Sequence, residues 1–263
     1  MPYNEEPMTL LDSIILGALE GFTEFLPISS TGHLILAAEL LGIPSTEFVK
    51  SFMIAVQLGA IAAVVILYWK KFLDIEVIKR LIVGFIPTGI IGFTLYQVVK
   101  DYLIGNSLIV VTALFVGGIA LILFEFMHKE SEDEAQEIRT LPYKQVALVG
   151  VFQSLAMIPG VSRSAATIVG GLLLGMRRTT IVEFSFLLAV PTMVAATGYD
   201  ILKSYDSFPT DGLELLAVGF VVSLIVALLS MRLLISFVKK HTFVPFGIYR
   251  IVLAALFFLF VLA

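Results

Sequence analysis

The chain has 263 residues, of which 59% are hydrophobic and only 14% are charged, and its formal net charge is −4. Its mean hydropathy is +1.00. The core of a soluble protein of this size could not bury so much apolar surface, so the composition excludes a soluble globular domain. It predicts an all-α, polytopic membrane protein in contact with membrane lipid, and we expect no nucleic-acid partner. Cysteine is absent, which excludes disulfides and thiolate catalysis.

Six apolar runs of near 20 residues predict six membrane crossings. Two polar segments interrupt this pattern, and most of the apolar arms that flank them, 10–26 and 33–41 around the first and 146–158 and 165–176 around the second, are too short to span. Each polar segment with its arms is therefore predicted to form a re-entrant helical hairpin, whose broken backbone must be covered by protein or water. The six runs are 48–69, 81–99, 108–127, 181–202, 213–238 and 243–262.

The order of one hairpin followed by three spans occurs twice within a single membrane domain, 1–263. It predicts a first repeat at 8–128 and a second at 142–263, and the similarity of 51–56 (SFMIAV) to 185–190 (SFLLAV) supports this division. Three crossings per repeat would invert the second repeat relative to the first. The two hairpins would then enter from opposite faces and meet near the midplane.

Basic residues indicate the orientation of these spans. With the N-terminus outside, twelve Lys and Arg lie on the cytoplasmic side and three outside, as short cytoplasmic loops require. Only Arg163 and Arg250 lie within apolar surroundings. The acidic run 130–137 is predicted to be a solvated loop.

The first polar segment, 20–33 (EGFTEFLPISSTGH), begins with two carboxylates. Gly17, Glu20, Gly21 and Glu24 follow helical spacing, which predicts one polar face on which small residues give access to the carboxylates. Two such charges in a poor dielectric require that one stays protonated or that Mg²⁺ or Ca²⁺ bridges them. The alternative is a pair of protonated carboxyls that hydrogen-bond between helices.

Hydroxyls and an imidazole follow in the same segment. Ser30 could act as an activated nucleophile, or His33 itself could attack phosphorus, and residue spacing leaves both readings open. Ser29 and Thr31 could bind phosphate or cap the following helix.

The second polar segment, 159–167 (PGVSRSAAT), has the composition of an anion site. Gly160 would let backbone amides approach an anion, while Ser162, Ser164 and Thr167 offer hydroxyls and Arg163 offers a fixed fork of donors.

For each arginine in apolar surroundings, a purely structural role is the alternative to a role in catalysis. Arg163 could form a buried ion pair with Glu24 instead of clamping phosphate. Arg250 stands alone in 246–250 (FGIYR), so we expect it to support the site rather than to act in catalysis.

At these two motif blocks the chain closely resembles the bacterial undecaprenyl-pyrophosphate phosphatases, the bacitracin-resistance phosphatase family. The resemblance covers the full length and includes 55–59 (AVQLG) and 183–191 (EFSFLLAVP). It implies hydrolysis of the terminal phosphate of a C55 polyprenyl diphosphate, with a divalent cation required, which recycles the carrier lipid for peptidoglycan synthesis. It also implies inverted repeats in the bacterial inner membrane and an active site open to the periplasm.

Site roles follow from the same resemblance. Glu20 and Glu24 would serve metal binding or base chemistry, Ser30 or His33 would be the nucleophile, and Arg163 would clamp phosphate. By the same resemblance Ser162, Ser164 and Thr167 would complete the anion pocket, while the chemistry of the two segments adds Ser29, Thr31 and Gly160 to the substrate-binding candidates.

The strongest rival is a flippase or anion transporter, because inverted repeats with broken helices are a transporter architecture. Such a protein needs binding alone, whereas the set of carboxylates, hydroxyls and imidazole suits cleavage. A third reading is a structural membrane subunit whose buried charges only hold helices together. The sequence leaves open whether the chain forms a homo-oligomer.

Overall fold

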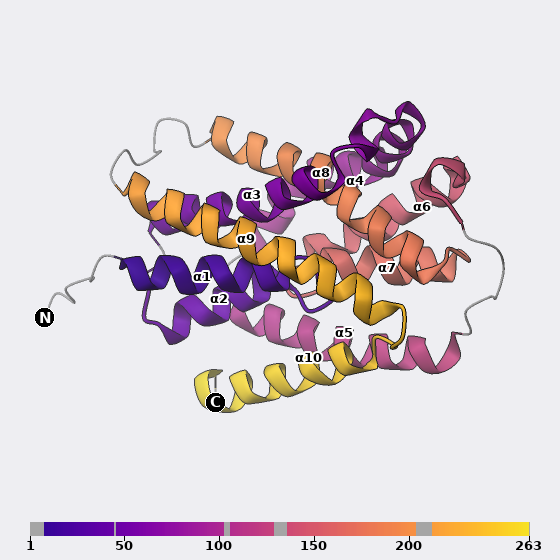
Figure 1. Ribbon diagram of the computed structural model, residues 1–263. Helices are drawn as coiled ribbons and strands as arrows, with labels where there is room; N and C mark the ends of the chain where they lie inside the picture. The colour runs from indigo at the N-terminus through magenta and orange to yellow at the C-terminus, as the bar shows by residue number, and fades with distance from the viewer. Residues whose placement is uncertain (1–7, 45, 103–105, 129–135, 204–211, 263) are drawn as a thin grey trace, which may run out of the picture.

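The computed structural model describes residues 8–44, 46–102, 106–128, 136–203 and 212–262, and in these ranges the chain is helical with no strand. Figure 1 shows long helices running between two ends of a bundle, with α1 and α2 toward one end and α6 and α7 toward the other. The prediction of an all-α membrane protein is confirmed. Most of the expected acidic loop, 130–135, lies outside the described residues.

Five helices are long and apolar enough to cross a membrane, while four shorter ones form the arms of the two expected hairpins. The long helices are α3 (Glu47–Tyr68), α4 (Ile75–Tyr102), α5 (Ser107–Met127), α8 (Arg178–Lys203) and α9 (Leu213–Val238). The arms are α1 (Leu10–Thr23), α2 (Ser30–Leu40), α6 (Tyr143–Gln153) and α7 (Arg163–Leu173).

The last expected crossing, 243–262, forms a shorter apolar helix. The α-helix α10 covers Val244–Phe257, and a π-helical turn continues it over Phe258–Leu262. Proline at the first turn suits this start, because its missing N–H has no partner there anyway. Five of the six predicted spans thus meet the length needed for a crossing, and the sixth stays a prediction.

The two hairpins turn in the same way. Ser29 caps α2 by accepting a hydrogen bond from the amide of Gly32, and Ser162 caps α7 by accepting one from the amide of Ala165. Both serines have a positive φ, 70° and 78°, which non-glycine residues rarely adopt. Of the two alternatives left open for Ser29, the capping role is therefore confirmed.

Glycine lets each hairpin approach a long helix closely. A Cβ added to Gly17 of α1 would lie 2.7 Å from the backbone oxygen of Gly219 in α9, and one added to Gly150 of α6 would collide with the backbone oxygen of Gly84 in α4. Helix α1 therefore packs on α9, and α6 packs on α4, with backbone against backbone.

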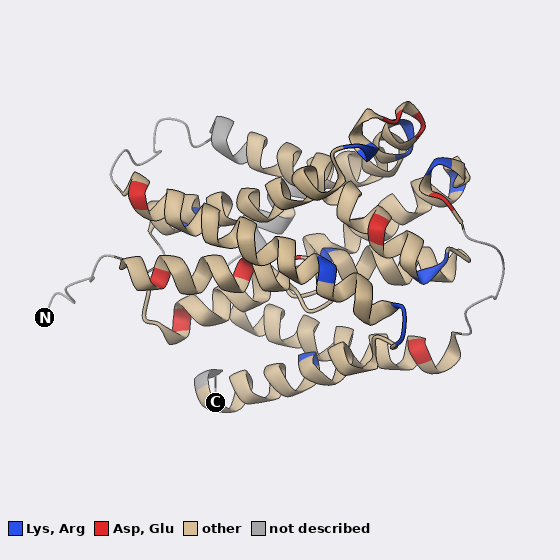
Figure 2. Cartoon of the chain, in the orientation of Figure 1, with Lys and Arg blue, Asp and Glu red and all other residues tan. Residues whose placement is uncertain are grey.

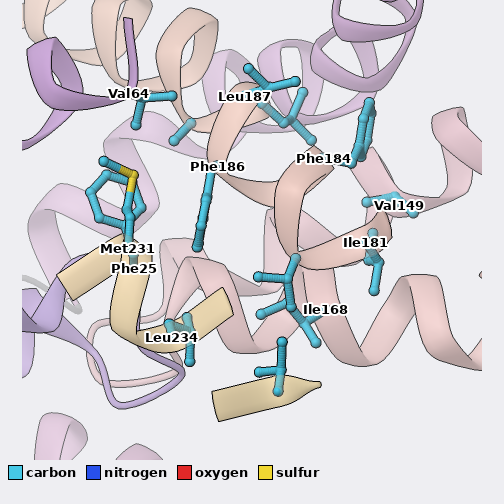
Figure 3. Packing of buried hydrophobic residues seen from close by; sticks show 14 of the residues in the cluster. Phe25, Val64, Val149, Ile168, Ile181, Phe184, Phe186, Leu187, Met231 and Leu234 are labelled. Atoms are coloured by element: carbon cyan, nitrogen blue, oxygen red, sulfur yellow. The ribbon is translucent and has the colours of Figure 1, made fainter. Parts of the chain in front are cut away.

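The main apolar core lies beside the tips of the hairpins. Figure 3 shows Phe25, from the first polar segment, facing Met231 of α9 and Phe186 of α8. The rings of Phe25 and Phe186 meet edge to face at 5.1 Å. This packing fixes the backbone from which the neighbouring Glu24 extends.

Candidate active site

The carboxylate of Glu24 and the guanidinium of Arg163 form a direct ion pair. Glu24 ends α1 and Arg163 begins α7, and Arg163 Nη2 lies 3.1 Å from Glu24 Oε1. Their side chains are only 6% and 10% exposed. The predicted meeting of the two polar segments is confirmed, and so is the buried contact that sequence reasoning considered as a structural alternative.

A second contact holds the other oxygen of Glu24. The hydroxyl of Ser30 donates to Glu24 Oε2 at 2.5 Å, and both side chains are buried. One carboxylate thus bridges a hydroxyl from its own segment and a guanidinium from the opposite one. A carboxylate in this position can accept the hydroxyl proton while the cation stays beside the reacting oxygen.

His33 is turned away from this contact. Its Nδ1 lies 2.8 Å from the carbonyl oxygen of Ser29, and its Nε2 lies 2.8 Å from the hydroxyl of Tyr249 in α10. Both ring nitrogens are therefore engaged, and neither is bonded to Ser30.

Glu20 lies one helical turn before Glu24 and is completely buried. Its carboxyl group shares a side-chain hydrogen bond with that of Glu24, no other described group bonds its oxygens, and the charges of Glu24 and Arg163 both act on it. The expectation that Gly17 and Gly21 open a path to the carboxylates is wrong, because both glycines are packed against the backbone of α9.

The second segment supplies its hydroxyls to protein partners. Ser164 donates to the carbonyl of Leu26 at 2.6 Å, so it ties the two segments together. Thr167 shares a hydrogen bond of 2.6 Å with Ser185 of α8, and Arg163 donates to the Ser185 carbonyl at 2.8 Å. These bonds fix the direction in which Arg163 extends.

Two further candidates for substrate binding are Thr31 and Gly160. Thr31 is exposed on the first turn of α2. Gly160 has a φ of 96°, and a Cβ there would lie 2.5 Å from the backbone oxygen of Val110, so close packing against α5 already requires glycine.

Arg250 is fully buried and connects both segments to α5. All five of its N–H donors reach backbone carbonyls, and none of these bonds goes to a carboxylate. The expectation of a supporting rather than a catalytic residue fits this geometry. The carbonyls belong to Pro27 in the first segment, Gly160 and Val161 in the second, and Ala113 and Leu114 in α5.

Ser185 and Tyr249 contact the site but were not predicted from the sequence. Ser185 begins the repeated hexapeptide, and Tyr249 precedes Arg250, yet neither position carries a charge or lies in a polar segment. Only the fold brings them to Arg163 and His33.

The carboxyl groups of Glu20 and Glu24 are the possible metal ligands at this site. Among the residues that the structure describes, no group of three or more His, Cys, Asp or Glu side chains could hold a metal ion. Glu20 and Glu24 provide two neighbouring carboxyl groups that bond each other, and no basic side chain among the described residues bonds Glu20. Such a pair fits a cation that takes its remaining ligands from water and substrate phosphate, as Mg²⁺ does.

Comparison with known proteins places these residues in a family. The family model described as bacitracin resistance protein BacA matches residues 13–256. A protein of Sulfurihydrogenibium sp. named undecaprenyl-diphosphatase is 55% identical over 252 residues, 96% of this chain and 99% of the relative. Proteins of the same name from Persephonella marina and Aquifex aeolicus are 54% and 52% identical, over 97% and 96% of this chain and 100% of each relative. The chain belongs to the BacA family.

Proposed function

We propose that this protein is a membrane phosphatase that hydrolyses the terminal phosphate of undecaprenyl diphosphate to give undecaprenyl phosphate and phosphate. The reaction recycles the carrier lipid for peptidoglycan synthesis and confers bacitracin resistance. Near-full-length identity above 50% to undecaprenyl-diphosphatases supports the reaction. The observation that carries the chemistry is the Glu24 carboxylate, held between the hydroxyl of Ser30 and the guanidinium of Arg163.

In this proposal Ser30 is the nucleophile. Its oxygen attacks the terminal phosphorus, its proton passes to Glu24 Oε2, and the bond to the bridging oxygen breaks to release undecaprenyl phosphate. Glu24 then hands this proton to the departing undecaprenyl phosphate and becomes a base again. Water attacks the phosphoserine, Glu24 takes the water proton and returns it to the Ser30 oxygen as the phosphoserine P–O bond breaks, so phosphate is freed and the Ser30 hydroxyl is restored. The hydrogen bond from Ser30 to Glu24, together with the engagement of both His33 nitrogens elsewhere, favours Ser30 over His33.

Arg163 neutralises the phosphate during this transfer. Phosphoryl transfer depends mainly on positioning and on charge stabilisation, and a guanidinium can bind two phosphate oxygens at once. Ser185 and Glu24 hold Arg163 beside the nucleophile before substrate arrives. Of the other candidates for substrate binding, Ser29 and Ser162 would shape the site as helix caps, whereas Thr31, Gly160, Ser164 and Thr167 stay predictions.

A divalent cation, Mg²⁺ or Ca²⁺, would be held by Glu20 and Glu24. When bound, it would neutralise phosphate charge and offset the repulsion between the two carboxylates. The closeness of two buried carboxyl groups, with no basic side chain bonded to Glu20, supports this assignment.

We further propose two inverted repeats, 8–128 and 142–263, each with a re-entrant hairpin. Three features support the repeat: the matched φ values of Ser29 and Ser162, the paired glycine contacts, and the placement of the hairpins toward opposite ends of the bundle (Figure 1). Lys and Arg gather toward the end where α6 and α7 lie (Figure 2), which supports a cytoplasmic location for that end. The site would then open to the periplasmic side of the bacterial inner membrane.

The proposed activity is tested by phosphate release from a C55 diphosphate by the purified protein in detergent. We expect turnover by the wild type, loss of turnover in Ser30→Ala and Arg163→Ala with folding retained, and a phosphorylated Ser30 when the reaction is quenched. Ser13→Ala is the matched control, because Ser13 is a buried serine bonded to the Leu215 carbonyl, outside the site. A wild type that binds the lipid without releasing phosphate would overturn the proposal in favour of a flippase, and phosphate on His33 would overturn the choice of nucleophile.

A further inference from the structure

The hydrogen bonds of His33 determine where its proton lies. A carbonyl oxygen only accepts hydrogen bonds, so the contact between Nδ1 and the Ser29 carbonyl requires a proton on Nδ1. In a neutral ring Nε2 then carries a lone pair, and that lone pair accepts the hydroxyl proton of Tyr249.

Tyr249 also fixes the plane of the imidazole. The two rings are parallel to within 2°, with their centroids 5.5 Å apart. His33 is only 5% exposed, whereas Tyr249 is 44% exposed on the outer surface of α10. The ring is thus held at one edge by its own segment and at the other by a helix from the opposite half of the chain.

We propose that Tyr249 is a positioning residue of this site, whose hydroxyl holds His33 in the Nδ1-protonated form with Nε2 directed away from Ser30. The inference rests on the proposed function and deepens it. It explains why a histidine three positions after the nucleophile does not compete with Glu24 for the Ser30 proton. It also removes His33 as an attacker, because attack through Nε2 would require the bond to Tyr249 to break first.

The two roles for His33 predict effects of opposite sign. If Tyr249 positions the ring, Tyr249→Phe keeps the aromatic contact but frees the imidazole, and kcat falls about tenfold with KM nearly unchanged. If His33 were the nucleophile, the same substitution would release Nε2 and kcat would rise. Tyr143→Phe is the matched control, because Tyr143 is also 44% exposed and its hydroxyl lies 3.4 Å from Glu76, outside the site.

A double-mutant cycle shows whether Tyr249 acts through His33. In a His33→Gln background, Tyr249→Phe is expected to change the residual kcat by less than twofold, because the group that it positions is gone. A full tenfold additional loss would show that Tyr249 acts in another way and would overturn the proposal. Melting temperatures of all variants separate these effects from loss of fold.

The protonation state is read independently of turnover by NMR of the protein labelled with ¹⁵N in its histidine rings. The chain has three histidines, so the His33 signals are identified by substituting His128 and His241. We expect a protonated Nδ1 and an unprotonated Nε2 in the neutral wild type, a moved Nε2 signal in Tyr249→Phe, and no change in Tyr143→Phe. A proton on Nε2 in the neutral wild type would overturn the inference, whereas an inactive wild type with the expected signals would count against the proposed function alone.

Discussion

The two polar segments have the same backbone frame but carry opposite chemistry. In each, a serine with a positive φ caps a short helix, and the next residue faces the centre of the site. That next residue is Ser30 in the first segment and Arg163 in the second. The frame thus offers equivalent positions to the hydroxyl of the proposed nucleophile and to a guanidinium.

Two segments with similar backbone frames can therefore carry different chemistry. Two segments of equal sequence would place like groups against each other, and like charges in a poor dielectric repel. Here the carboxylate comes from one segment and the guanidinium from the other, so their contact stabilises the junction and aligns the reacting groups. Each segment is therefore incomplete without its counterpart.

The largest expected effect comes from removing the charge that joins the two segments. Glu24→Gln keeps the shape of the side chain but loses the base for Ser30 and the counter-ion of Arg163, so kcat should fall about 10³-fold. The measurement is steady-state phosphate release with the divalent cation varied. Glu39→Gln, on α2 beside Ser107, should retain wild-type kcat. Unchanged turnover in Glu24→Gln would break the assignment of opposite roles to the two segments.

A smaller effect is expected from weakening the hydrogen bonds by which Arg250 holds the two segments together. Lysine cannot supply the five-donor fork of Arg250, so Arg250→Lys should leave several buried carbonyls without a donor. We expect the free energy of unfolding to fall by about 2 kcal/mol and kcat by about 10²-fold. Both are measured in detergent, by thermal unfolding and by phosphate release.

Arg178→Lys provides the control for a buried arginine outside the site. Arg178 forms a buried pair with Glu125, so its replacement should lower stability while kcat stays within about twofold of the wild type. Equal losses of kcat in the two variants would show that Arg250 has no specific role in positioning.

The smallest effects are expected from replacing Ser29 and Ser162, which cap the two short helices and take no part in the proposed reaction. Ser29→Gly and Ser162→Gly each lose a capping bond, which costs a few tenths of a kcal/mol, but relieve a left-handed conformation that costs a side chain about 1 kcal/mol or more. We expect melting temperatures equal to or slightly above that of the wild type, and kcat within about fivefold. A loss of 10²-fold in either variant would show that these serines bind substrate directly.

The sequence was sufficient to predict the helical membrane class, the short arms and the meeting of Glu24 with Arg163. Composition and run length determine the first two, and the cost of burying unpaired charge led to the third. The prediction that Gly17 and Gly21 leave a path to the carboxylates was wrong. A stripe of small residues permits either an open path or close helix packing, and only the position of α9 decides between the two.

The partners of individual polar groups could not be predicted from sequence. Ser30 is nearer in sequence to His33 than to Glu24, yet it donates to Glu24, while helix α10 brings Tyr249 to the imidazole. Arg250 gave no signal beyond its isolation, since its partners are backbone carbonyls, which every residue carries. Such contacts depend on tertiary packing.

The contact between the two segments can be tested by cross-linking, because the chain contains no cysteine of its own. Cysteines at Glu24 and Arg163 should be joined in high yield by a short bifunctional thiol reagent in membranes, as detected by mass spectrometry. Cysteines at Glu24 and Lys50, which is exposed at the first turn of α3, should not be joined. Absence of the Glu24–Arg163 cross-link in folded protein, with both thiols reactive, would contradict the account that one shared site is built from two opposed segments.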